Sequence, residues 1–300
     1  MIEIKATLKN DLTINAQVNE SEKSAVCFLH FSGGTLHMWN GVLPLFENNY
    51  KVIVPDLRGH GKSDKPADSY HIDDMANDVY LLLRKLGINE CHIIGSSLGA
   101  EVGLSLAASH PSMVLSLVCE GAIYNEFGEY GLFNGTEQEI QDKKEKLTEE
   151  LMQRKVPFHG SKADYLAEAR SQLVENKLWN PYFSKYLDST VAQTEDGRYT
   201  SHYLNRVRTA YIQTYWNLEF EDYYKEIQCP VLFLVSREEK ENPKITHSLS
   251  YFQSLVKSYS EVVVTQGMHA YVWMQYPKET GERVESFIRS VTKNNKIHSI

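Results

Sequence analysis

Cysteine is scarce in this sequence, with four residues among 300. No Cys-x-x-Cys or His-x-x-x-His spacing is present, although such spacings are typical of zinc sites. We therefore expect no bound metal. We expect Cys27, Cys91, Cys119 and Cys229, which lie in or beside predicted strands, to be buried thiols rather than disulfides.

Glycine-rich nucleotide-binding patterns are also missing. Gly61-Lys62-Ser63 ends like a phosphate-binding loop, but Asp56 occupies the position of the first glycine. Gly59-x-Gly61 begins like a dinucleotide fingerprint, but Asp64 occupies the third glycine position. The sequence therefore predicts no cofactor.

Long apolar runs and an excess of positive charge are both lacking. No stretch approaches the roughly 18 apolar residues that a membrane span needs, and residues 1–5 do not begin a signal peptide, so we expect a cytoplasmic protein. Lys and Arg number 31 against 39 Asp and Glu, a net charge of −8. Nucleic acids and anionic membranes are therefore not expected partners. A small-molecule substrate is expected, and nothing indicates an oligomeric state.

The residues that are present alternate between short apolar runs and helical patterns. Residues 2–8 and 12–18 predict an antiparallel strand pair, and residues 72–86 have apolar side chains at helical spacing. Further buried strands are expected from the segments 26–29, 52–54, 91–94, 114–118, 231–235 and 261–264. This order predicts an α/β fold, with a mostly parallel sheet covered by helices on both faces.

The alternation stops between residues 122 and 224. Thr136-x-x-Glu139 and Ser161-x-x-Asp164 predict helix starts by capping boxes. The first of these helices has only a thin apolar stripe, so we expect it to be mostly solvated. We therefore expect two domains: a core formed by residues 1–121 and 225–300, and an inserted helical cap formed by residues 122–224. Because aromatic residues are frequent in its later part, we expect a mostly apolar, enclosed pocket.

A candidate nucleophile lies at a sharp strand-to-helix turn, in Gly95-Ser96-Ser97-Leu98-Gly99. The strand 91–94 precedes it and a small-residue helix, 98–109, follows. In this context Gly-x-Ser-x-Gly exposes the serine hydroxyl at the start of a helix. We therefore identify Ser97 as the candidate nucleophile.

A serine nucleophile needs a base, and the base needs an acid that orients it. His269 is the best candidate base because it directly follows the strand 261–264, at a strand end where catalytic residues of parallel sheets lie. Glu239, just after the strand 231–235, is the favoured acid. Glu120, which follows the strand 114–119, and Glu238 remain alternatives.

The oxyanion of an acyl-transfer intermediate also needs hydrogen-bond donors. One candidate is the backbone N–H of Leu98, which follows the nucleophile. The second should come from the glycine-containing loop after the strand 26–29, with Ser32 or Gly33 as the donor.

Four stretches of this sequence resemble the α/β-hydrolase superfamily, in its cap-bearing serine hydrolase branch. They are Leu29-His30-Phe31-Ser32-Gly33-Gly34, Asp56-Leu57-Arg58-Gly59-His60-Gly61-Lys62-Ser63, residues 95–99, and Gly267-Met268-His269. The resemblance implies an eight-stranded, mostly parallel sheet and a helical cap after the sixth strand. It also implies a triad at Ser97, Glu239 and His269. The sequence departs from the family pattern at Phe31, where glycine is usual, and at Glu239, where aspartate is usual.

These residues predict a serine hydrolase that cleaves a small, largely apolar carboxylic ester or lactone through an acyl-enzyme on Ser97. Dehalogenases and epoxide hydrolases of the resembling family use Asp at the turn, so Ser97 argues against both activities. Two alternatives remain: a carbon–carbon bond hydrolase or cofactor-free peroxidase with the same triad, and a slow-turnover ligand-sensing protein of the same fold.

Overall fold

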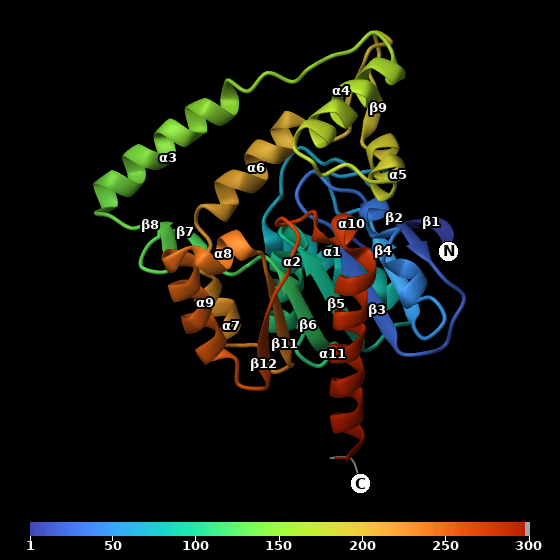
Figure 1. Cartoon of the computed structure of the whole chain (residues 1–300), viewed down its shortest axis with the longest axis vertical. Helices are drawn as coiled ribbons and strands as arrows, with labels where there is room; N and C mark the ends of the chain where they lie inside the picture. The colour runs from blue at the N-terminus through green and yellow to red at the C-terminus, as the bar shows by residue number, and fades with distance from the viewer. Residues whose placement is uncertain (298–300) are drawn as a thin grey trace.

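The computed structural model describes residues 1–297, and the surroundings of the side chains of residues 1–293 (Figure 1). An eight-stranded sheet with the order β1-β2-β4-β3-β5-β6-β11-β12 forms its centre. The strand bounds are β1 Ile2–Thr7, β2 Thr13–Val18, β3 Ala25–Leu29, β4 Lys51–Pro55, β5 Cys91–Ser96, β6 Val114–Glu120, β11 Val231–Val235 and β12 Ser260–Val264. β2 runs antiparallel to both β1 and β4, and the neighbouring pairs from β4 to β12 are parallel.

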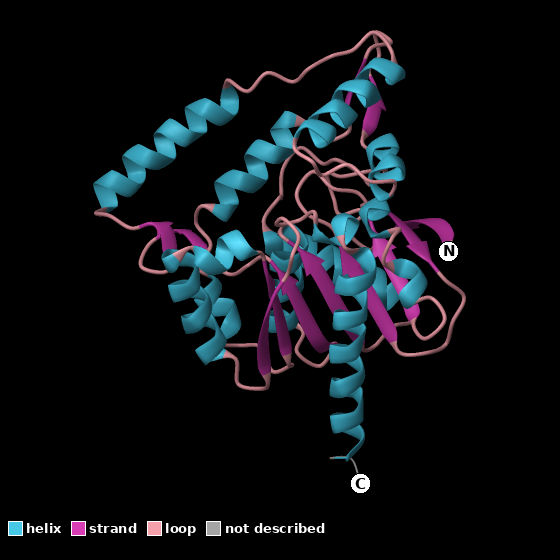
Figure 2. Ribbon diagram, viewed as in Figure 1, coloured by secondary structure: helices cyan, strands magenta, loops and turns pink. Residues whose placement is uncertain are grey.

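Helices cover both faces of this sheet (Figure 2). The helices that come before β6 or after β10 are η1 Leu36–Trp39, η2 Leu43–Leu45, α1 Ile72–Lys85, α2 Leu98–Ser109, α6 Asn205–Tyr215, α7 Phe220–Tyr224, α8 Arg237–Glu241, α9 Pro243–Leu255, α10 Val272–Gln275 and α11 Pro277–Ile297. One core cluster includes residues of α1, α2, α7 and α9, and the other includes residues of η1, α10 and α11. The predicted doubly covered, mostly parallel sheet is therefore confirmed.

The apolar pattern located the main elements closely. Each predicted strand of the sheet corresponds to one of the eight strands, and the predicted antiparallel pair is β1 with β2. The helix predicted over 72–86 is α1, with Gly87 at a φ of 75° just after its end. Short runs of apolar residues are reliable here because parallel strands are buried on both faces.

The segment between β6 and β11 lies over one end of the main sheet (Figure 1). It contains helices α3 Glu137–Met152, α4 Lys162–Glu175 and α5 Tyr182–Ser189, followed by α6 and α7. It also contains four short strands that the sequence did not predict: β7 Asn125–Phe127, β8 Gly131–Phe133, β9 Val191–Gln193 and β10 Tyr199–Ser201. Strands of three residues are too short to show an alternating pattern.

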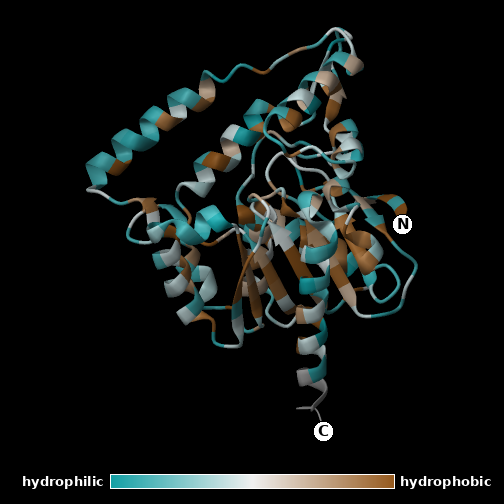
Figure 3. Cartoon of the chain, viewed as in Figure 1, coloured by the Kyte–Doolittle hydropathy of each residue, from teal (hydrophilic) through white to brown (hydrophobic). Residues whose placement is uncertain are grey.

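Helix α3 is solvated, as its sequence predicted. The Thr136 hydroxyl accepts a hydrogen bond from the Glu139 N–H, and the Glu139 carboxylate accepts one from the Thr136 N–H, which is a complete capping box. No α3 residue is buried, and its polar colouring contrasts with the apolar strands of the sheet (Figure 3). At the start of α4, the Ser161 hydroxyl accepts from the Asp164 N–H, but the Asp164 carboxylate bonds to the hydroxyl rather than to the backbone.

The loop formed by residues 56–63 is held by buried polar contacts. The Asp56 carboxylate accepts a hydrogen bond from the Leu36 N–H at 2.8 Å. Arg58 pairs with Asp78 at 2.5 Å, and both side chains are buried. These contacts connect the loop to η1 and to α1.

The four cysteines are buried and free, as expected. Among the helices in residues 1–297, none combines the length and apolarity that crossing a membrane requires.

Candidate active site

The turn at residues 95–99 joins β5 directly to α2. Ser97 has a φ of 50° and a ψ of −119°, in the positive-φ region that side chains rarely adopt. Both flanking glycines are required by close packing. A Cβ atom on Gly95 would lie 2.4 Å from Ala100, and one on Gly99 would lie 2.0 Å from the Leu29 carbonyl oxygen. The turn is therefore compact, and Ser97 is its least buried residue.

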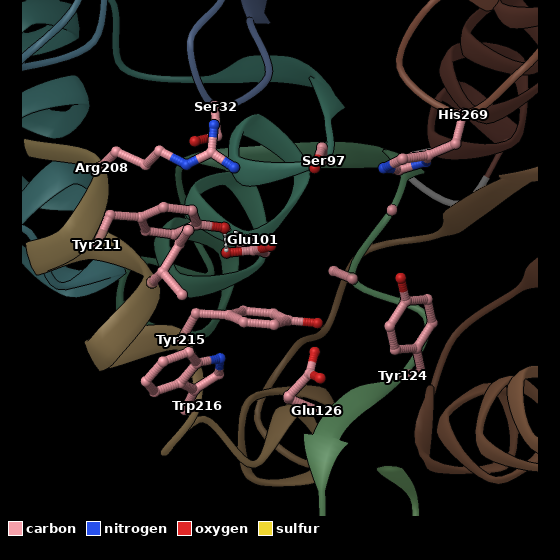
Figure 4. Close-up of a pocket in the computed structure, with 13 residues that line it drawn as sticks. Ser32, Ser97, Glu101, Tyr124, Glu126, Arg208, Tyr211, Tyr215, Trp216 and His269 are labelled. Atoms are coloured by element: carbon pink, nitrogen blue, oxygen red, sulfur yellow. Dashed lines mark hydrogen bonds between the residues drawn. The ribbon is translucent and has the colours of Figure 1, made fainter. Parts of the chain in front are cut away.

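His269 and Ser97 converge on Gly121, which follows β6. A Cβ atom on Gly121 would lie 2.7 Å from Ser97 Cα and 3.4 Å from His269 Cε1. The imidazole points toward the Ser97 side chain (Figure 4). The structure therefore brings the two residues together, although 172 positions separate them in the chain (269 − 97).

Two carboxylates lie at the Nδ1 atom of His269. Glu120 Oε1 is 2.8 Å away, and Glu239 Oε1 is 3.2 Å away. Both distances are those of ion pairs, but neither oxygen lies in line with an Nδ1–H bond. Glu238, the third candidate acid, is exposed on α8. The structure thus places Glu120 and Glu239 at the histidine and Glu238 outside the site.

Glu120 is held more completely than Glu239. Its carboxylate accepts hydrogen bonds from the Ser96 hydroxyl at 2.5 Å and from the Ala270 N–H at 2.7 Å. Glu239 belongs to a capping box at the start of α8, where its Oε2 accepts from the Ser236 N–H at 2.7 Å. One oxygen of Glu239 therefore serves the helix and the other faces His269.

The two carboxylates favour a protonated histidine. Burial alone would lower the pKa of His269, but the charges of Glu120 and Glu239 outweigh it and raise this pKa to about 9. The side chain keeps 36% of its surface accessible because it borders a cavity.

The predicted oxyanion donors lie at different places. Leu98 is the first residue of α2, and Ser32 borders the same cavity as Ser97. Within residues 1–297, neither of their N–H groups donates a hydrogen bond to the protein. Gly33 instead lines a neighbouring cavity, and its carbonyl accepts a hydrogen bond from His202 at 3.2 Å. Of the three predicted donors, Leu98 thus directly follows Ser97, Ser32 lines the cavity that Ser97 borders, and Gly33 lines the neighbouring one.

Ser97 and His269 border a cavity of about 350 Å³ (Figure 4). Its wall contains the aromatic residues Tyr124, Tyr211, Tyr215 and Trp216 and the ionisable residues Glu101, Glu126 and Arg208. The expectation of a mostly apolar pocket is therefore wrong. The aromatic residues are there, but charged side chains lie between them, and the cavity is partly open.

Glu101 is a site residue that the sequence analysis missed. It lies one helical turn after Ser97, is 4% exposed, and its two carboxylate oxygens accept from the Tyr211 hydroxyl at 3.0 and 2.8 Å. Burial raises its pKa to about 7. A signal was available, because Glu101 is the only charged residue in the helix 98–109.

Among the described residues, no cluster of three His, Cys, Asp or Glu side chains could hold a metal ion. The site therefore consists of a serine, a histidine and carboxylates. This set can transfer a proton from serine to histidine and accept an acyl group on the serine oxygen.

The chain is similar to a known protein family and to several curated proteins. The family model described as alpha/beta hydrolase fold matches residues 24–273. Among curated proteins, fluoroacetate dehalogenase of Burkholderia sp is 41% identical over 112 residues, which are 36% of each chain. The 3-oxoadipate enol-lactonase 2 of Acinetobacter baylyi is 35% identical over 102 residues, 34% of this chain and 38% of the relative. The chain thus spans little more than a third of the length of these relatives.

Solved structures match over nearly the whole chain. The structure of E-2-(acetamidomethylene)succinate hydrolase has a TM-score of 0.73 and covers 96% of this chain and 99% of its own. Its sequence identity of 21% is low, so this likeness concerns the fold.

Proposed function

The chain belongs to the α/β-hydrolase family, and on that premise we propose that it is a hydrolase that cleaves a carboxylic ester or lactone through an acyl-enzyme on Ser97. The convergence of Ser97 and His269 on Gly121, at the wall of one cavity, is the observation that carries this proposal. A relative named as an enol-lactonase supports the choice of substrate class.

In the acylation half, His269 Nε2 takes the proton from the Ser97 hydroxyl while the serine oxygen attacks the substrate carbonyl carbon. The carbonyl oxygen becomes an oxyanion, which the N–H groups of Leu98 and Ser32 stabilise. His269 then gives the proton to the leaving alcohol oxygen as its bond to the carbonyl carbon breaks. The product of this half is an ester on Ser97 and a free alcohol.

In the deacylation half, His269 removes a proton from water, and the resulting hydroxide attacks the ester on Ser97. The same two N–H groups receive the second oxyanion. The proton returns to the serine oxygen, which leaves as the free hydroxyl, and the carboxylic acid is released. A lactone follows the same steps, but its alcohol and acid remain in one molecule.

We assign Glu120 as the main acid that orients His269, in place of the Glu239 favoured by the sequence. Glu120 is nearer to Nδ1, and other donors fix both of its oxygens. Glu239 adds a second negative charge at the same nitrogen. A protonated intermediate of His269 is thus stabilised from two sides.

The test compares the release of nitrophenol from short-chain nitrophenyl esters by the wild-type protein and by Ser97→Ala. We expect kcat/KM to fall by about 10³-fold or more in the variant, as when a triad nucleophile is removed. Ser109→Ala, at the far end of the same helix, is the matched control and should leave the rate unchanged. Equal rates for wild type and Ser97→Ala would refute the proposal.

The same assay separates the alternative functions. Parallel measurement on a vinylogous diketone would identify a carbon–carbon bond hydrolase, and a single-turnover burst without steady-state release would identify a slow ligand-sensing protein.

A further inference from the structure

Arg208 borders the catalytic cavity and has no hydrogen-bond or ion-pair partner among the side chains that the structure describes. Its side chain extends from α6 into the cavity on the side of Ser32 (Figure 4). The Nε atom is buried and makes no hydrogen bond. Among the described residues, no carboxylate lies within ion-pair distance of the guanidinium. A buried N–H donor without an acceptor is rare because it loses its hydrogen bond to water.

Arg208 lies on the face of α6 that borders the cavity. Arg208, Tyr211, Ile212 and Tyr215 follow the spacing i, i+3, i+4, i+7, which places them on one face of a helix. All four border the cavity. The hydroxyl of Tyr211 is fixed by Glu101, so the face is anchored next to the turn that carries Ser97. Arg208 therefore belongs to the wall of the site rather than to the solvent-exposed face of the helix.

The acidic residues of the cavity do not neutralise Arg208. Glu101 is engaged with Tyr211, and Glu126 lies across the cavity, beside Tyr215 (Figure 4). Arg154, which shares a neighbouring cavity with Arg208, adds a second positive charge rather than a negative one, and burial and the charge of Arg208 both lower its pKa. Among the described residues no ion pair neutralises Arg208, so its positive charge at one end of the cavity, in a chain with a net charge of −8, forms a local site for an anion.

We propose that Arg208 binds a carboxylate of the substrate, so that the natural substrate is an ester or lactone that carries a free carboxylate group. The planar guanidinium matches a carboxylate with two parallel hydrogen bonds, and it stays charged at any physiological pH. The inference rests on the proposed function, because it assigns the substrate class of the same site.

Kinetics on two esters of matched length test this proposal. Mono-4-nitrophenyl glutarate carries a free carboxylate, and 4-nitrophenyl valerate does not. We expect the wild-type protein to prefer the glutarate ester in kcat/KM. Arg208→Gln should lower kcat/KM for the glutarate ester by about 10- to 100-fold, the effect of a charge-assisted hydrogen bond, and change that for the valerate ester by less than about threefold.

Arg206→Gln is the matched control. Arg206 lies on the same helix but is exposed, and its side chain donates to the carbonyl oxygens of Lys65 and Pro66. This variant should keep the preference for the anionic ester. Equal hydrolysis of both esters by the wild-type protein, or equal losses for both esters in Arg208→Gln, would overturn the inference and leave the esterase function standing.

A binding measurement decides the case in which neither ester is hydrolysed and the proposed function itself fails. Glutarate is titrated calorimetrically into Ser97→Ala and into Ser97→Ala/Arg208→Gln. Binding that weakens at least tenfold without Arg208 supports the carboxylate site independently of turnover. Absence of glutarate binding to Ser97→Ala, or equal binding to both proteins, overturns it.

Discussion

At His269, two carboxylates share one nitrogen. Glu120 and Glu239 approach Nδ1 from different elements, β6 and α8, and together raise the pKa of the imidazole to about 9. A general base acts only in its neutral form. The free enzyme should therefore gain activity as the pH rises toward this value, rather than near the usual value of about 6.5 for histidine.

This arrangement predicts different effects for two conservative substitutions. Glu120→Gln should lower kcat by up to about 10⁴-fold, the effect of neutralising the acid of a Ser-His-Asp triad. It should also move the acidic limb of the kcat/KM profile to lower pH, because a negative charge that favours protonated His269 is lost. Glu239→Gln should lower kcat by less than about tenfold, with a smaller shift in the same direction. Rate measurements across pH with a nitrophenyl ester check both.

Glutamine can still complete the capping box at Ser236, so Glu239→Gln is a matched control for the fold of α8. The assignment of Glu120 is wrong if Glu239→Gln causes the larger loss and the larger shift.

The sequence identified the serine and the histidine as candidates, but it did not show which carboxylate lies nearer to the histidine. Ser97 and His269 follow strands whose apolar runs are plain, so their places at the sheet edge could be predicted. The acids differ by 0.4 Å in distance from Nδ1 (3.2 − 2.8), which no pattern reports. One signal was overlooked: Ser236-x-x-Glu239 is a capping-box pattern, which indicates that Glu239 also serves its own helix.

At the level of elements, the turn between β5 and α2 is a tightly packed part of the site. Gly99 lies against the backbone of Leu29 at the end of β3, so that any side chain would enter the neighbouring strand. Glycine here serves close approach rather than flexibility.

Gly99→Ala should therefore destabilise the protein by about 1–3 kcal/mol or more, because the added methyl group has no space. Gly160→Ala, where nothing lies within 4 Å of the added atom, is the control and should change stability by less than about 0.5 kcal/mol. Urea unfolding measures both. Equal stability of the two variants would show that the turn can relax, contrary to the geometry.

Helix α3, unlike the tightly packed turn between β5 and α2, buries no residue, so its stability depends on its N-terminal capping box. Thr136→Ala should weaken it locally by about 1 kcal/mol, the usual cost of losing an N-cap side chain. Amide hydrogen exchange should quicken in residues 137–152 and stay unchanged in β5. Lys146→Ala, exposed in the middle of α3, should have a much smaller effect. Faster exchange throughout the molecule would contradict the local character of this helix.

At the level of elements, short apolar runs and alternation predicted the eight strands of the main sheet, apolar periodicity predicted helix α1, and a run of small residues predicted helix α2. The segment between β6 and β11 was harder to predict, because its four short strands have too few residues to show an alternating pattern. The cavity wall on α6 could not be predicted either. The helical spacing puts Arg208 and Tyr211 on one side of α6, but the sequence does not show that this side borders the cavity at the end of the sheet.

For the molecule as a whole, the buried carboxyl group of Glu101 links the free energy of unfolding to pH. Its pKa rises from an ordinary value of 4.5 to about 7 on folding. The folded state therefore holds a proton that the unfolded state has lost between these values. This contribution is fully present below pH 4.5 and disappears as the pH rises through about 7.

The free energy of unfolding should fall less between pH 5 and 8 in Glu101→Gln than in the wild-type protein, by on the order of 2–3 kcal/mol, because glutamine does not ionise. Urea unfolding at a series of pH values, compared between wild type and variant, measures the difference. Asp142→Asn, exposed on α3, is the control and should follow the wild-type curve. Parallel curves for wild type and Glu101→Gln would show that Glu101 ionises normally.

The most direct test of the central claim is covalent labelling of Ser97. A fluorophosphonate reacts with an activated serine when the serine oxygen displaces fluoride, and it leaves a stable phosphonyl ester. Tandem mass spectrometry of the digested protein should place the label on Ser97, with none on the Ser97→Ala variant and little on His269→Ala. Labelling of another residue, or of none while the protein still hydrolyses an ester, would contradict the account.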